Sequence, residues 1–204
     1  MQVFVPSSDY TQSVKSLDNS RVLKQCVEST QLLDIMFNIP TKSGKPRKGW
    51  LSHPALIAWK NNPGALIEYT WECVKEAKSR GIKTQSFEQK LNSYPVCPST
   101  PPIWLGDDLV HSSHRSRLLQ KGWETMHNAG KNQTKILNAV KIIAWYKSFN
   151  WEELQDEYLM DREYQWPTDI SSNSYSLKVS VSKDAIKKKE LIIEQYGKNP
   201  YINL

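Results

Sequence analysis

The sequence predicts an all-α fold in one compact domain. Apolar residues repeat at helical spacing in several long stretches, and Pro or Gly residues separate these stretches. A chain of 204 residues can bury a sizeable core. Its 39% hydrophobic and 24% charged residues are also typical of globular proteins. We therefore expect a bundle of helices joined by irregular connections.

The first half of the chain predicts four helices in order. A short extended entry over residues 2–6 precedes the first helix, which Asp9 can cap. Pro40 ends the long second helix, and Gly81 stops the helix that begins at Pro63. An exposed basic loop, TKSGKPRKG, occupies residues 41–49. The expected helices are a short one from residue 9, residues 16–37, a short one from Pro54, and residues 63–80.

The second half predicts three further helices. Four prolines between residues 92 and 103 indicate an irregular connection there. Helices are expected at residues 107–121, 133–149 and 183–196. The segment SSNSYSLKVSVS at residues 171–182 alternates weakly, and it predicts either a hairpin strand or a loose segment.

Composition and charge narrow the range of functions. The net charge of +6 permits a nucleic-acid partner but does not require one. Three cysteines without a C-x-x-C pair argue against a disulfide framework and a cysteine-based zinc site. The N-terminal segment lacks the pattern of a signal peptide, and no apolar run approaches the length of a membrane span. We expect a cytoplasmic monomer that needs no metal or other cofactor.

The helix at residues 16–37 carries the most informative pattern. At about 100° per residue, its apolar side consists of Val22, Leu23, Cys26, Leu33 and Phe37. Roughly opposite lie Arg21, Lys24, Gln25 and Glu28. Taken alone, this polar side is a solvated face on which Lys24 and Glu28 form an i,i+4 pair.

The polar side also resembles a motif of bacterial and phage proteins related to the pyrimidine-dimer DNA glycosylase endonuclease V, LD-x-x-R-L-x-K-Q-R-V-E. Later blocks follow in the same order and make the resemblance more specific. They are G-W-x-x-HPA-x-x-x-W at residues 49–59, R-G at 80–81, W-L-G-D at 104–107, H-x-SHRS at 111–116 and Y-x-W-P at 164–167. The matching helix residues are Leu17, Asp18, Arg21, Lys24, Gln25, Val27 and Glu28.

The resemblance implies an all-α, compact single-domain glycosylase of the endonuclease V type over residues 1–167. Residues 122–144 look like an inserted helix, and residues 168–204 look like a C-terminal extension. The partner that it implies is double-stranded DNA. One departure is Cys26, which stands where the motif has Arg and so lacks a charge that could contact a phosphate or base.

The resemblance also implies a reaction centre. Cleavage of an N-glycosidic bond builds positive charge on the sugar, and a carboxylate beside the sugar stabilises that charge. The family uses one helix glutamate for this, and Glu28 occupies its place. Arg21 and Gln25 complete the candidate catalytic group.

The attacking group is open between three candidates. The family uses the terminal amine, which here belongs to Met1 because the bulky Gln2 disfavours removal of the initiator methionine. Lys24, one helical turn from Glu28, is a second amine, and a water activated by Glu28 is the third. The length of the stretch before Glu28 favours water, with an abasic site as the main product. An associated AP-lyase step stays open.

Several basic residues are candidate contacts to DNA phosphates. For His53 a packing role at the start of a helix is the stronger alternative, and for the loop at 42–48 simple solubility is the alternative. The candidates are His53, Lys45, Arg47, Lys48, His111, His114, Arg115 and Arg117. Because the target base must leave the stack, aromatic residues are also needed. Trp50, Trp59 and Trp104 are candidates for this, with core packing as their default.

We therefore expect a DNA glycosylase that acts on a damaged or modified pyrimidine in duplex DNA. An alternative substrate is a bulky modified cytosine, hydroxymethylated or glucosylated, in an attack on foreign phage DNA. The alternative from another class is a non-catalytic DNA-binding protein. Glu28 argues against it, because an anion that faces phosphates weakens binding.

Overall fold

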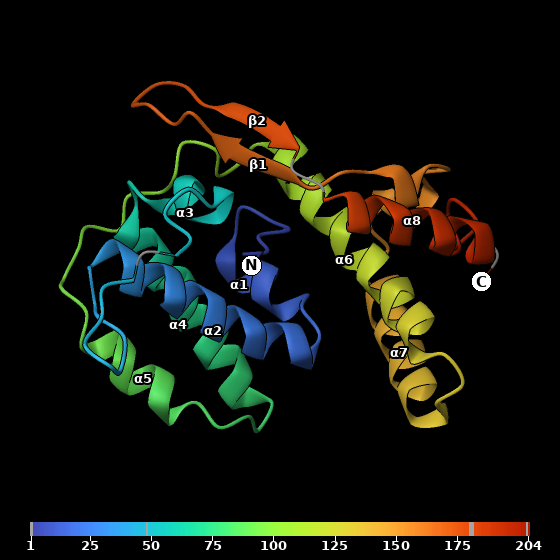
Figure 1. Ribbon diagram of the computed structural model, residues 1–204, viewed down its shortest axis with the longest axis horizontal. Helices are drawn as coiled ribbons and strands as arrows, with labels where there is room; N and C mark the ends of the chain where they lie inside the picture. The colour runs from blue at the N-terminus through green and yellow to red at the C-terminus, as the bar shows by residue number, and fades with distance from the viewer. Residues whose placement is uncertain (1, 48, 180–181, 203) are drawn as a thin grey trace. The chain divides into compact units, whose positions relative to one another are not determined.

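The computed structural model describes residues 2–47, 49–179, 182–202 and 204, and most of them are helical. The predicted all-α class is confirmed. Within the described residues, the β structure is one two-stranded sheet of β1 (Gln165–Thr168) and β2 (Ser176–Val179), visible as a hairpin in Figure 1. No helix in the described ranges has the length and apolar character to cross a membrane.

The chain forms two compact units. The first comprises Met1–Asp107 and Trp166–Lys178, and the second comprises Asp108–Gln165 and Val179–Leu204. The expected domain boundary at residue 167 therefore falls within β1, and the expected division into a glycosylase domain and an extension stays a prediction.

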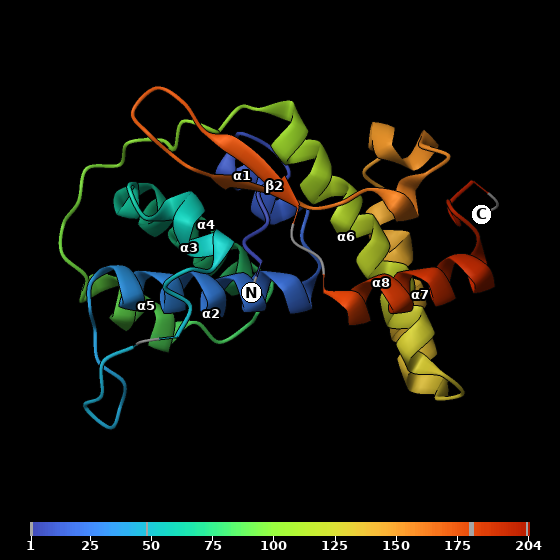
Figure 2. The same ribbon diagram turned by 45° about the horizontal axis from the view of Figure 1, so that its top comes forward.

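Helices α2 and α4 form the centre of the first unit. They lie side by side in both views of the ribbon (Figures 1 and 2). On α2 the predicted apolar side is buried at Val22, Cys26 and Leu33, whereas Leu23 is exposed. The helices of this unit are α1 (Tyr10–Lys15), α2 (Asn19–Met36), α3 (Pro54–Trp59), α4 (Pro63–Ser79) and α5 (Gln85–Asn92).

The helix ends follow local side-chain chemistry. Asp9 caps α1, where its carboxylate accepts a hydrogen bond from the Gln12 amide at 2.9 Å. Asp18 caps α2, so this helix begins at residue 19 rather than near residue 16 as predicted. Gly81 follows Arg80, the C-cap of α4, and takes a φ of 74°, as its role as a stop requires. The sequence does not predict α5, because its eight residues contain few apolar positions.

The proline-rich segment packs closely on the first turn of α4. A Cβ placed on Gly64 would lie 2.1 Å from the carbonyl oxygen of Pro98. This contact is possible only for glycine, because no other residue leaves that space empty. Gly64 therefore fixes the segment that precedes the second unit in sequence.

The second unit is built on α6 (Asp108–Ala129), which α7 (Gln133–Lys147) follows along its length. Helix α6 runs eight residues past its predicted end at 121, so the expected insertion contains the end of α6 and most of α7. The remaining elements are η1 (Glu152–Gln155), η2 (Leu159–Asp161) and α8 (Lys183–Tyr196). Tyr201, beyond α8, donates to the Leu119 carbonyl at 3.0 Å, so the end of the chain packs on α6.

A charge cluster on α6 stabilises this unit. Arg117 and Lys121 lie 2.6 Å and 2.9 Å from the carboxylate oxygens of Glu124. Burial alone would raise the pKa of Glu124, but the two positive charges outweigh it and bring the pKa down to about 2. The carboxylate is therefore favoured in the folded state.

Gly64→Ala should destabilise the first unit. The added methyl group meets the Pro98 backbone, which cannot move aside as a flexible side chain would, so we expect a cost of about 1–3 kcal/mol in the free energy of unfolding. Chemical denaturation of both variants gives this difference. The control is Gly49→Ala, because a Cβ there meets nothing within 4 Å. Equal stability of the two variants would contradict the close contact.

The contribution of Glu124 to stability should depend on pH. Since its pKa in the folded protein lies below the ordinary 4.5, the stabilisation is complete above that value and is lost as the pH falls toward 2. The difference in unfolding free energy between the wild type and Glu124→Gln, at most about 3 kcal/mol at neutral pH, should shrink over this range. Urea denaturation at several pH values measures it. A difference independent of pH would refute the charge explanation.

Candidate active site

Glu28 lies in the middle of α2 and is largely buried, with 8% of its surface exposed. Its Oε2 atom accepts a hydrogen bond from the backbone amide of Gln2 at 2.8 Å. Its Oε1 atom lies 3.7 Å from the ammonium group of Lys24, one turn earlier. The carboxylate therefore faces the beginning of the chain on one side and an exposed cation on the other.

The segment before α1 is held in place by Gln25 and Tyr69. The Gln25 side chain accepts from the Phe4 amide at 2.8 Å and donates to the Gln2 carbonyl at 3.0 Å. The Tyr69 hydroxyl, on α4, donates to the Phe4 carbonyl at 2.7 Å. We call these three hydrogen bonds the N-terminal clamp. It forms because the buried, extended segment needs partners for its backbone groups.

The other two candidates on this helix differ in their surroundings. Arg21 forms an ion pair with Asp18 at 2.7 Å, so it reinforces the cap of α2. Lys24 is 68% exposed along its side chain, and its ammonium group is available to a ligand. Met1 lies outside the described residues. The catalytic roles of all these residues stay predictions.

His53 caps α3. Its Nδ1 atom accepts a hydrogen bond from the Ala55 amide at 3.1 Å, so the proton of the neutral ring is on Nε2. Burial lowers the pKa of His53, which favours this neutral form. The geometry fits the packing alternative, although the Nε2 edge can still donate to a ligand.

The basic loop is anchored at one end. Arg47 pairs with the buried carboxylate of Asp34 at 2.8 Å and donates to the Ile39 carbonyl at 3.1 Å. Asp34 also binds Lys90 at 2.6 Å, from α5. Lys45 is exposed, and Lys48 lies outside the described residues. Sequence reasoning missed Asp34, whose signal was a lone acid within the apolar run LLDIM.

The remaining DNA-binding candidates belong to α6 of the second unit. His111 and His114 are buried, and the His114 ring stacks on Tyr164 with 4.3 Å between ring centroids. Arg115 forms ion pairs with Glu153 and Asp108, at 2.9 Å and 3.0 Å. Arg117 binds Glu124. These side chains are engaged within the unit, and their contact with DNA stays a prediction.

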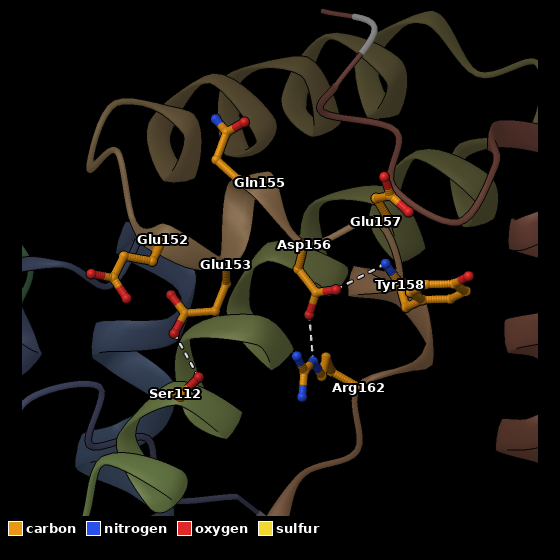
Figure 3. Close-up of a pocket in the computed structure, with 8 residues that line it drawn as sticks. All are labelled: Ser112, Glu152, Glu153, Gln155, Asp156, Glu157, Tyr158 and Arg162. Atoms are coloured by element: carbon orange, nitrogen blue, oxygen red, sulfur yellow. Dashed lines mark hydrogen bonds and ion pairs between the residues drawn. The ribbon is translucent and has the colours of Figure 1, made fainter.

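An open pocket of about 470 Å³ lies in the second unit, around η1 and η2. Figure 3 shows carboxylates at its rim: Glu153 accepts from Ser112, and Asp156 faces Arg162. Its lining residues are Ser112, Glu152, Glu153, Gln155, Asp156, Glu157, Tyr158 and Arg162. Four acidic residues against one arginine repel phosphates, so this pocket does not suit DNA. No group of three or more potential metal ligands comes together among the residues that the structure describes.

Comparison with known protein families gives a match over the first part of the chain. Residues 1–89 match the family described as pyrimidine dimer DNA glycosylase. No curated protein and no solved structure matches the chain. The match includes the blocks at residues 17–28, 49–59 and 80–81, whereas the blocks at 104–107, 111–116 and 164–167 lie beyond it. It also contains Glu28 and every residue of the N-terminal clamp. Over residues 1–89, the protein is therefore similar to the pyrimidine dimer DNA glycosylase family.

Proposed function

We propose that this protein is a DNA glycosylase that releases a damaged pyrimidine from duplex DNA, with Glu28 as its central catalytic residue. The observation that carries the proposal is the position of the Glu28 carboxylate, largely buried and 2.8 Å from the Gln2 amide nitrogen. Among the described residues, its partners are this amide and the exposed Lys24 ammonium group 3.7 Å away. A carboxylate buried with this support is costly for the fold alone, which supports a role in chemistry.

The carboxylate acts on the charge of the transition state. As the bond between the base and C1′ breaks, the electron pair leaves with the base and the sugar becomes cationic. Glu28 stabilises this cation, and its burial strengthens the attraction because water screens the two charges less. Lys24 neutralises the negative charge of Glu28 only weakly, because its ammonium group is 3.7 Å away and exposed.

We propose the α-amino group of Met1 as the attacking group. It is three covalent bonds from the Gln2 nitrogen, which the N-terminal clamp holds at Glu28. The neutral amine adds to C1′ as the base departs, loses a proton and forms an imine once the sugar ring opens. The sequence alone favours water, whereas the contact between Gln2 and Glu28 supports the amine. Gln25 is then a positioning residue.

Glu28→Gln should abolish base release, because the amide cannot stabilise a sugar cation. Binding to DNA should stay equal or become tighter, since a negative charge near phosphates is removed. Duplexes that carry ultraviolet damage, uracil or hydroxymethylcytosine are incubated with each protein, and abasic sites are counted. The matched control is Glu190→Gln, an exposed glutamate of α8. Near-normal turnover by Glu28→Gln would remove Glu28 from the reaction.

Borohydride should trap the amine as a covalent adduct between protein and DNA. We expect wild-type protein and Lys24→Gln to form the adduct equally, and a short N-terminal extension to prevent it, because the extension displaces the amine from Glu28. The adduct is measured by gel electrophoresis. Base release without an adduct would show that water attacks, and an adduct lost only in Lys24→Gln would assign the attack to Lys24.

A further inference from the structure

Trp50 differs from the other two tryptophans that the sequence singles out. Trp59 and Trp104 are 2% and 1% exposed, and the Trp104 indole donates to the Ala58 carbonyl at 2.8 Å. They belong to the core of the first unit. Trp50 is 52% exposed, and the adjacent Leu51 is 60% exposed. These two residues therefore form an apolar tip, which we call the Trp50 tip.

The indole of Trp50 is supported from behind. The His53 ring meets it edge-on, with 4.8 Å between centroids and 63° between planes. The buried Trp166 supports His53 in turn, at 5.5 Å and 87°. This series of rings restricts the rotation of Trp50 while half of its surface stays open to a ligand. A preorganised aromatic surface loses little entropy on binding.

Stability of the folded chain does not explain the tip. Trp50 has a φ of 72°, in the left-handed region that glycine adopts easily and bulky residues avoid. The half of the indole that is open to water and the exposed part of Leu51 add no packing to the fold. Backbone strain together with an exposed aromatic ring is therefore better explained by a binding role.

The charge of the same loop identifies the partner. Lys42 and Lys45 are exposed, and within the described part of the chain neither lies in an ion pair with a carboxylate. Cations that follow a phosphate backbone, next to aromatic rings on which bases stack, are the combination that binds nucleic acids. A partner protein would need a larger apolar area than this tip offers.

We propose that the Trp50 tip inserts into the base stack of duplex DNA where a base has left it. Removal of a base from the stack leaves a gap, and an aromatic face restores the lost stacking. The tip then contributes to binding only where the duplex has a gap, whereas Lys42 and Lys45 contribute to binding of any duplex. The proposal rests on the proposed glycosylase function, since it assigns a task within base release.

The test uses a duplex with a tetrahydrofuran abasic analogue, which presents a gap whatever base the enzyme removes. A 2-aminopurine opposite the analogue reports stacking by its fluorescence. Wild-type protein should bind this duplex more tightly than an intact duplex of equal length. Trp50→Ala should bind the gapped duplex at least about tenfold more weakly than the wild type, and it should not produce the fluorescence change. Its affinity for the intact duplex should be nearly that of the wild type. Trp50→Phe should retain most of both.

Two controls separate this role from a structural one. Trp145→Ala removes an exposed tryptophan of α7 and should change neither affinity. Trp50→Gly suits the backbone conformation, so its unfolding temperature should equal or exceed that of the wild type while its preference for the gap disappears. The proposal would be overturned if Trp50→Ala bound the gapped duplex as tightly as the wild type. It would also be overturned if the substitution weakened the affinity for gapped and intact DNA by the same factor.

Base release by the wild type is assayed in parallel, so that the two proposals fail separately. If the wild type releases no base from any damaged duplex, the proposed function fails. If it releases a base and Trp50→Ala still binds the gapped duplex normally, only the insertion of the Trp50 tip fails.

Discussion

The candidate site depends on the N-terminal clamp. Residues 2–5 have neither helix nor sheet to satisfy their backbone groups, although most of them are buried. Gln25 and Tyr69, from α2 and from α4, supply partners for the Gln2 carbonyl and for the Phe4 amide and carbonyl. An unpaired buried amide or carbonyl costs about 1–3 kcal/mol, so these hydrogen bonds favour the observed position of the segment. That position brings Gln2 to Glu28.

Arginines and lysines have different surroundings in this protein. Arg47, Arg115 and Arg117 each form an ion pair with a carboxylate that is largely buried, where a planar guanidinium can make two hydrogen bonds at once. Lysines, with their single flexible ammonium group, lie mostly at the exposed positions. A count of basic residues in the sequence therefore overestimates the charge that a phosphate backbone can meet.

Local chemistry made part of this structure predictable. Asp9, Pro63 and Gly81 mark helix ends through groups adjacent in sequence. Lys24 and Glu28 are four residues apart, so they lie next to each other on any α-helix. Contacts between distant residues were not predictable. The Gln25 side chain could have faced solvent, and only the fold shows that it holds residues 2 and 4 instead. The binding of Asp34 by Arg47 and Lys90 likewise joins segments that no local pattern connects.

The environment of Asp34 affects how the basic loop would meet a ligand. A loop that is ordered only on contact loses conformational entropy at that moment, and its affinity falls accordingly. Here part of this ordering occurs during folding, because Asp34 holds Arg47 from inside the protein. If the loop contacts DNA as proposed, its binding strength depends on a carboxylate that solvent scarcely reaches. A substitution of Asp34 would then weaken the binding of a ligand that Asp34 itself does not touch.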